Sequence, residues 1–162
     1  MFLKVADIKI EPGIPRQFSF DVAADKLPLG EVIVNEPIAA NLELTYLGEE
    51  KGIVIEGKLK ARLTPCCNRC LKRYGLDFEA TFFEEISGRE MGDDLVFIGD
   101  SLDLSQLVRE RFLVSLPQKF ICRDDCAGLC PGCGQDLNEG ACRCEDEELD
   151  PRLTVLKKLL EE

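Results

Sequence analysis

The sequence predicts an α+β fold: a mostly antiparallel β-sheet with one or two helices, followed by a C-terminal cysteine-rich module. Three observations in the 162 residues carry this prediction. Apolar and polar residues alternate in several early segments, as they do in strands that bury one face. One later segment repeats its apolar residues at helical spacing. Nine cysteines occur, six of them between residues 122 and 144.

The alternating segments define the predicted sheet in chain order. The clearest are residues 38–47, 53–63 and 76–82. In the first of them Ile38 and Leu42 point to one face, whereas Asn41 and Glu43 point to the other. A turn-rich stretch, residues 48–52, links the first two segments. Further candidate strands are residues 2–10, 16–22 and 95–98.

One helix is predicted after these strands. Asp103 offers an N-cap and Gln106 follows three residues later, which is the capping-box pattern. Pro117 ends the segment. The apolar residues at helical spacing are Leu104, Leu107, Val108, Phe112 and Leu116. A short second helix is predicted to begin at Asp150-Pro151, as N-cap and first helical residue.

The composition excludes several classes of function. The chain has no histidine, so neither a Ser-His-Asp nor a Cys-His catalytic arrangement nor a His-ligated metal site can form. No P-loop and no GxGxxG motif occurs. No apolar run is long enough for a transmembrane helix, and the N-terminus lacks the pattern of a secretory signal. We therefore expect a cytoplasmic protein that does not span a membrane, in which any acid–base chemistry would need a carboxylate, a lysine or a cysteine.

The cysteines form four closely spaced pairs, which is typical of metal ligation. Cytosolic thiols are kept reduced, so ligation is favoured over disulfides. Structural zinc takes four thiolates as a tetrahedron, usually from two close pairs. The pairs nearest in sequence define the predicted ribbon site: Cys130, Cys133, Cys142 and Cys144. The other two pairs define the predicted knuckle site: Cys67, Cys70, Cys122 and Cys126. We expect one or two Zn²⁺ ions and a zinc-ribbon-like module.

Other interpretations of the cysteine pattern stay open. An iron–sulfur cluster also takes four thiolates, although the tight CPGCG turn ending at Gly134 favours zinc. A redox-active C-x-x-C pair normally opens a helix, whereas the segment after Cys70 is predicted to be a strand. Cys66 is left over, either as a replacement for Cys67 or as a buried thiol. We place a β-rich domain, with the CxRC knuckle and the amphipathic helix, over residues 1–117. The cysteine-rich zinc-binding module and the C-terminal helix occupy 118–162.

The charge is unevenly distributed. The chain carries a net charge of −11, yet residues 51–73 hold seven Lys and Arg against one acid. Such a stretch is a plausible track for a phosphate backbone. The candidate RNA-binding residues are Lys58, Lys60, Arg62, Arg69, Lys72 and Arg73. The alternative is cross-strand pairing of these cations with Glu43, Asp77 and Glu79.

Several segments together resemble a known family. They are the Cys67-Asn68-Arg69-Cys70-Leu71 motif, the stretch from Ile98 to Pro117, the stretch from Cys122 to Cys144, and Asp150-Pro151-Arg152-Leu153. This pattern is similar to the YceD family of bacterial large ribosomal RNA subunit accumulation proteins. The resemblance implies a cytosolic ribosome-biogenesis factor that is not an enzyme and has no small-molecule substrate. It would support accumulation or processing of large-subunit ribosomal RNA by binding the precursor RNA or a large-subunit ribosomal protein.

Two hypotheses from other classes compete with this one. The cysteines also suit a thiol-based redox or zinc-sensing protein. The other hypothesis is a metal-dependent ribonuclease, because two-metal catalysis uses clustered carboxylates. The candidate carboxylates are Asp93, Asp94, Asp100 and Asp103. However, two of them fall in a predicted loop and Asp103 is expected to cap a helix, so we assign no catalytic residues.

Overall fold

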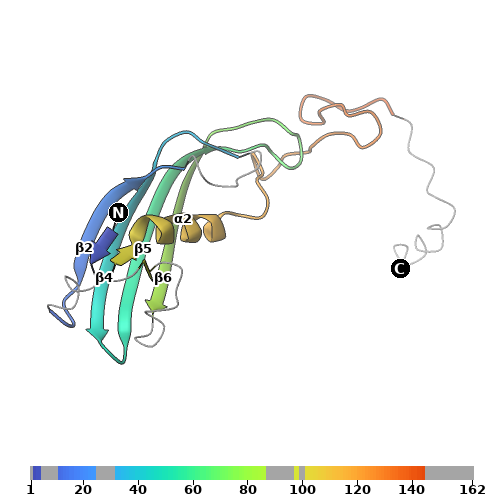
Figure 1. Ribbon diagram of the computed structural model, residues 1–162. Coiled ribbons are helices and arrows are strands. Elements are labelled where there is room, and N and C mark those ends of the chain that lie inside the picture. Colours follow the sequence, from blue (N-terminus) through green and yellow to red (C-terminus); the bar gives the residue numbers. More distant parts are fainter. Residues whose placement is uncertain (1, 5–10, 25–31, 87–96, 99–100, 145–162) are drawn as a thin grey trace, which may run out of the picture.

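In a computed structural model, the described residues form two antiparallel sheets and one helix, followed by the cysteine-rich segment (Figure 1). The structure describes residues 2–4, 11–24, 32–86, 97–98 and 101–144. The elements in chain order are β1 (Phe2–Lys4), β2 (Arg16–Val22), β3 (Ile33–Val34), β4 (Ile38–Gly48), β5 (Gly52–Thr64), β6 (Leu76–Ile86), β7 (Phe97–Ile98), β8 (Ser101–Asp103) and α2 (Leu104–Ser115). All described strand pairings are antiparallel, which confirms the expectation of a mostly antiparallel sheet.

The larger sheet has β4 and β5 at its centre, flanked by β2 and β6. The short strand β3 pairs with the last residues of β5, on the side of β5 that β4 also occupies. Leu63 of β5 pairs with Val34 of β3 on this side and with Leu76 of β6 on the other side. Gly48 and Gly52 pair across the turn between β4 and β5, and both have the positive φ that glycine adopts easily. The smaller sheet has the order β1-β8-β7.

Alternation places the apolar side chains of β4 and β5 on one face, and these side chains are buried. They are Ile38, Ala40, Leu42, Leu44 and Tyr46 in β4, and Ile53, Ile55, Leu59, Ala61 and Leu63 in β5. Gly57 lies in the same inward register and pairs with Phe82 of β6. A Cβ atom at position 57 would overlap the Phe82 ring, so the ring covers the place that a side chain would take.

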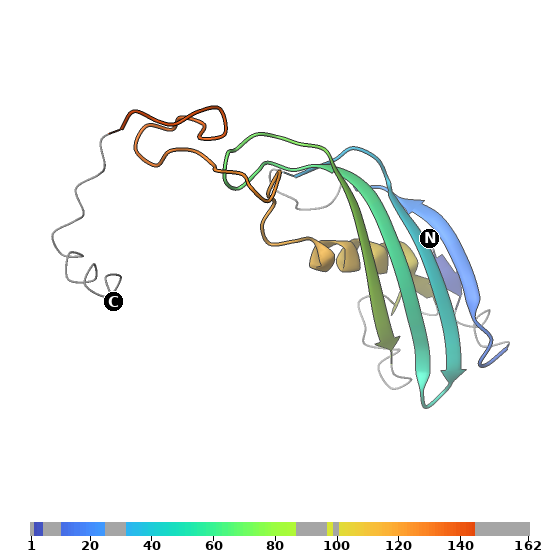
Figure 2. The same ribbon diagram turned by 180° about the vertical axis from the view of Figure 1, so that it is seen from behind.

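Helix α2 packs against this apolar face (Figure 1, Figure 2). Phe112 is fully buried and meets Phe78 of β6 edge to face, with ring centroids 5.6 Å apart. Asp103 caps the helix, because its Oδ1 accepts from the backbone N–H groups of Ser105 and Gln106. The side-chain amide of Gln106 donates along the helix to Glu110.

The predicted elements that extend beyond the described residues are the helix at Asp150-Pro151, most of the segment 2–10 and half of 95–98. Asp93, Asp94 and Asp100 also lie outside the described residues. In the described part of the chain, no helix is long and apolar enough to cross a membrane.

The β5–β6 connection extends beyond the end of the larger sheet and meets the chain that follows α2 (Figure 1, Figure 2). Asn68 makes two of the hydrogen bonds that join them: its N–H donates to Phe120 O at 2.8 Å, and its Oδ1 accepts from the Phe120 N–H at 2.7 Å. This junction carries the cysteines.

Candidate metal centres

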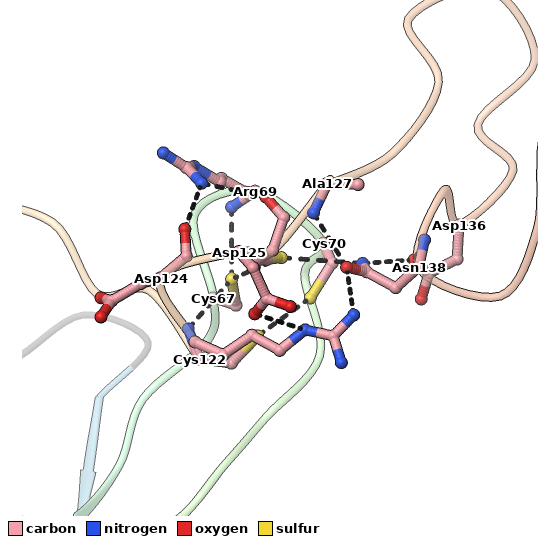
Figure 3. A network of polar contacts seen from close by, with 11 residues as sticks. Cys67, Arg69, Cys70, Cys122, Asp124, Asp125, Ala127, Asp136 and Asn138 are labelled. Carbon is pink, nitrogen blue, oxygen red and sulfur yellow. Dashed lines mark hydrogen bonds and ion pairs between the residues drawn. The ribbon is translucent and has the colours of Figure 1, made fainter.

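The knuckle site brings together two cysteine pairs that are far apart in sequence. Cys67 and Cys70 lie in the β5–β6 connection, whereas Cys122 and Cys126 follow α2 (Figure 3). The four sulfur atoms lie within 4.8 Å of one another. Cys67, Cys70 and Cys126 are buried, and Cys122 is half-buried. The structure thus assembles the four residues that the spacing assigned to one site.

The sulfur geometry fits a tetrahedral metal ion. A zinc ion with Zn–S bonds of about 2.3 Å sets its sulfurs roughly 3.8 Å apart. The Sγ atoms of Cys67 and Cys126 are 3.9 Å apart, and those of Cys70 and Cys122 are 3.7 Å apart. The backbone N–H groups of Arg69 and Cys122 also point at Cys67 Sγ, at 3.4 and 3.5 Å. The donor set and its spacing fit Zn²⁺, which would be held by four thiolates.

The surroundings of Cys67 favour the thiolate form of its side chain. Burial acts to raise the pKa of this thiol, but the backbone N–H groups of Cys70, Cys122 and Arg69 outweigh it and bring the pKa to about 6. The pKa of Cys122 moves the opposite way, to about 12, because of burial and the neighbouring cysteine side chains. Four such sulfurs can all be thiolates only beside a compensating cation.

The two residues inside the knuckle, Asn68 and Arg69, fix it to the second cysteine pair. Asn68 makes the two bonds to Phe120 described above. The Nη1 of Arg69 donates to the carbonyl oxygens of Asp124 and Cys126, at 3.2 and 2.9 Å. The carbonyl of Arg69 accepts from Leu129 N at 3.1 Å. Arg69 therefore ties the knuckle to the loop that carries the other two sulfurs.

The ribbon site follows within one short segment and is more open. Its sulfurs, from Cys130, Cys133, Cys142 and Cys144, also lie within 4.8 Å of one another. Cys130 and Cys144 Sγ are 3.9 Å apart, which again fits a tetrathiolate metal site. Backbone N–H groups of Cys133 and Gly132 lower the pKa of Cys130 to about 6. Cys133 and Cys144 are exposed, so this site meets solvent on one side.

Cys66 lies outside both clusters. Its thiol donates to the carbonyl of Leu71 at 3.0 Å, and its backbone bridges to Arg73. Its sulfur is not among the four that cluster at the knuckle site, and the residue is half-buried rather than fully buried.

The structure also shows where the six candidate RNA-binding residues lie. Lys58, Lys60 and Arg62 point to the solvent-exposed face of β5. Lys60 pairs with Glu79 at 2.6 Å and Arg62 with Asp77 at 3.2 Å, which are the cross-strand pairs of the alternative interpretation. Lys58 makes no ion pair with any residue that the structure describes.

The three cations nearest the knuckle also have intramolecular partners. Arg69 binds carbonyl groups as described. Lys72 pairs with Asp136 at 2.7 Å and with Glu139 at 2.6 Å. Arg73 has a partner within the chain as well.

Sequence reasoning missed one residue of this region, Asn138. Its Nδ2 donates to Cys126 Sγ at 3.6 Å (Figure 3). Its Oδ1 accepts from Ala127 N and from Arg123 Nη2, each at 2.8 Å. An asparagine in a loop ordinarily indicates a turn, and nothing in the spacing of the cysteines points to an amide that contacts a distant thiolate.

Comparison with known proteins places these clusters in a family. A sequence model described as "Large ribosomal RNA subunit accumulation protein YceD" matches residues 55–160. The chain is also 26% identical over 144 residues to an uncharacterized protein of Mycobacterium bovis and to two of Mycobacterium tuberculosis. Each alignment covers 83% of this chain and 69% of the relative. No solved structure matches. Because the matched region is more than half of the chain and contains both cysteine clusters, this protein belongs to the YceD family.

Proposed function

We propose that this protein is a non-enzymatic ribosome-biogenesis factor of the cytoplasm. It supports accumulation of large-subunit ribosomal RNA by binding a component of the immature large subunit. The observation that carries the proposal is the family match over residues 55–160, which spans every residue of the two cysteine clusters.

We further propose that each cluster holds one Zn²⁺ in a structural role. All four positions of each cluster are cysteines, so the set leaves no open position for a substrate, as a catalytic zinc site requires. The zinc would instead supply folding free energy to loops that have few apolar contacts of their own. The knuckle site would fasten the β5–β6 connection to the chain after α2.

A large-subunit ribosomal protein is the partner that we favour over precursor RNA. RNA binding needs cations that are available to phosphates. Here Lys60, Arg62 and Lys72 are paired with carboxylates, and Arg69 is bonded to carbonyl groups. The net charge of −11 opposes a phosphate backbone and complements a basic protein.

The proposal is tested in cells that lack the protein. We expect less large-subunit than small-subunit ribosomal RNA, restored by the wild-type gene but not by Cys67→Ser/Cys70→Ser. In a sucrose gradient of native lysate the tagged protein should migrate with particles lighter than the mature large subunit. An unchanged RNA ratio together with migration only at the top of the gradient would contradict the proposal.

One observation favours the second candidate, a thiol-based redox or zinc sensor. Cys133 and Cys144 are exposed, so an oxidant can reach the ribbon site. A sensor would release zinc reversibly on treatment with peroxide. Slow and uniform alkylation of all thiols in the zinc-loaded protein would count against it.

A further inference from the structure

The ribbon loop, residues 134–141, joins the two cysteine pairs of the ribbon site but contacts the knuckle site. Asn138 at its centre donates to Cys126 Sγ, a knuckle sulfur (Figure 3). The same side chain accepts from Ala127 N and Arg123 Nη2, which flank that sulfur in the chain. Asn138 therefore holds the Cys122–Cys126 turn from outside, as an outer-shell group does around a metal site.

Asp136 orients Asn138 and also ties the loop to the knuckle a second time. Asp136 Oδ1 accepts from the backbone and the side-chain amides of Asn138, at 2.9 and 2.6 Å. Its Oδ2 pairs with Lys72, two residues after Cys70, and Glu139 pairs with the same Lys72. The Asp136 side chain is 11% exposed and that of Lys72 is 56% exposed, so the carboxylate of this pair is shielded from water while the ammonium group is not.

Backbone hydrogen bonds form a third connection between the ribbon loop and the knuckle site. Leu137 N donates to Gly128 O at 2.9 Å, and Leu129 N donates to Arg69 O at 3.1 Å. Gly128 has a φ of +78°, and a Cβ there would lie 3.0 Å from the Arg69 carbonyl oxygen. The chain between the two clusters thus approaches the knuckle as closely as glycine allows.

We propose that the two metal sites load cooperatively, with Asn138 as the positioning residue that couples them. Metal at the ribbon site closes the ends of the ribbon loop and so removes the conformational freedom that the loop would otherwise have. The ordered loop then presents Asn138 to Cys126 and Asp136 to Lys72. Binding at one site must strengthen binding at the other by the same factor. This inference rests on the proposal that both clusters bind zinc.

Zinc affinities in two backgrounds test the coupling. The overall constant for two zinc ions is measured by chelator competition in the wild-type protein and in Asn138→Ala. The single-site constant is measured in Cys130→Ser/Cys133→Ser, with and without Asn138→Ala. Outer-shell substitutions lower metal affinity by about 10- to 100-fold. We expect Asn138→Ala to lower the two-zinc constant at least tenfold, and to change the single-site constant much less.

Two further variants sharpen the result. Gln135→Ala is the matched control, because Gln135 lies in the same loop and its side chain donates to Ala141 O rather than to the knuckle. It should leave both constants unchanged. Asn138→Asp keeps the acceptor for Ala127 N, loses the amide donor to Cys126 Sγ and places a second negative charge beside Asp136 Oδ1, so it should lower the two-zinc constant at least as much as Asn138→Ala does.

Two results would overturn the coupling. Equal losses in both backgrounds would make Asn138 a local part of the knuckle site, and no loss in either would remove it from metal binding. The zinc stoichiometry of the wild-type protein is measured first. Fewer than two zinc ions per chain would refute the premise itself, and this outcome is thereby separated from a failure of the coupling alone.

Discussion

Leu71 and Gly134 occupy the same position in two equivalent turns, one from each metal site. Each residue directly follows the second cysteine of a C-x-x-C pair, and each donates its N–H to the carbonyl of the first cysteine, at 2.9 and 2.8 Å. Each has a positive φ, 58° for Leu71 and 75° for Gly134. The N–H of the first cysteine in each pair donates to the carbonyl of the residue that follows Leu71 or Gly134. That residue is Lys72 in the knuckle site and Gln135 in the ribbon site. The sequence thus uses one backbone turn twice, although a leucine fits this conformation poorly.

The left-handed conformation of Leu71 predicts that glycine is tolerated there. A non-glycine residue in this region costs about 1 kcal/mol or more, and Leu71 is 62% exposed, so its side chain makes little contact in return. Leu71→Gly should match or exceed the wild-type protein in free energy of unfolding at a fixed free zinc concentration, measured by urea denaturation. Gly134→Leu is the reciprocal change and should destabilise the ribbon site. A large loss of stability in Leu71→Gly would contradict this account.

The geometry of the Arg69 guanidinium, and not only its charge, should stabilise the knuckle site. Arg69→Lys keeps the charge but loses the rigid, planar guanidinium, whose Nη1 donates to two carbonyl oxygens. We expect this substitution to lower the zinc affinity of the knuckle site by about tenfold. The affinity is measured by competition with a chelator. If Arg69 instead served mainly to bind phosphate, Arg69→Lys would retain zinc normally.

The exposed cations of β5 should be dispensable for binding to the immature subunit. Because Lys60 and Arg62 are paired with Glu79 and Asp77, the triple reversal of Lys58, Lys60 and Arg62 to glutamate should leave sedimentation with the particles unchanged. The measurement is the sucrose gradient at low and moderate salt. Loss of the protein from the particles would support the RNA-facing interpretation of this strand.

The packing of α2 on the sheet should dominate the stability of the larger part of the molecule. Phe112→Ala removes a fully buried ring that contacts Phe78, and such changes cost about 3–5 kcal/mol. Val114→Ala is the matched control on the same helix, since Val114 is 77% exposed, and should change stability by less than about 0.5 kcal/mol. Equal effects of the two substitutions in urea denaturation would contradict the packing described.

Metal removal should affect the cysteine-rich segments and spare the sheet. The buried apolar cluster of the sheet and α2 contains no cysteine ligand. A chelator should therefore remove hydrogen-exchange protection from the amides of Cys67, Cys130 and Gly134, which bond within the turns. The amides of β4 and β5 should stay protected. Loss of protection throughout the larger sheet would show that its folding depends on the metal.

The sequence predicted the sheet well because its signal is local. Alternation with a period of two assigns each residue of β4 and β5 to a face without knowledge of the partner strand. The cysteine sets were predictable for a related reason, since close pairs restrict the ways in which four sulfurs can meet. The division of the chain after residue 117 stays a prediction.

The contacts around the clusters were not predictable in the same way. Arg69 and Lys72 belong to a cationic run, which alone fits phosphate binding and internal pairing equally well. Only the fold places Asp136 beside Lys72 and the carbonyl of Cys126 beside Arg69. Asn138 depends on the same long-range arrangement, because the ribbon loop meets Cys126 through tertiary packing and not through any sequence periodicity.

The measurement that tests the central claim most directly is the metal content and sulfur coordination of the protein purified from its native cells. Elemental analysis should give two zinc ions per chain. X-ray absorption at the zinc edge should show four sulfur ligands at about 2.3 Å and no nitrogen or oxygen ligand. Iron in place of zinc, fewer than two metal ions per chain, or a mixed ligand shell would contradict the account of two structural tetrathiolate sites.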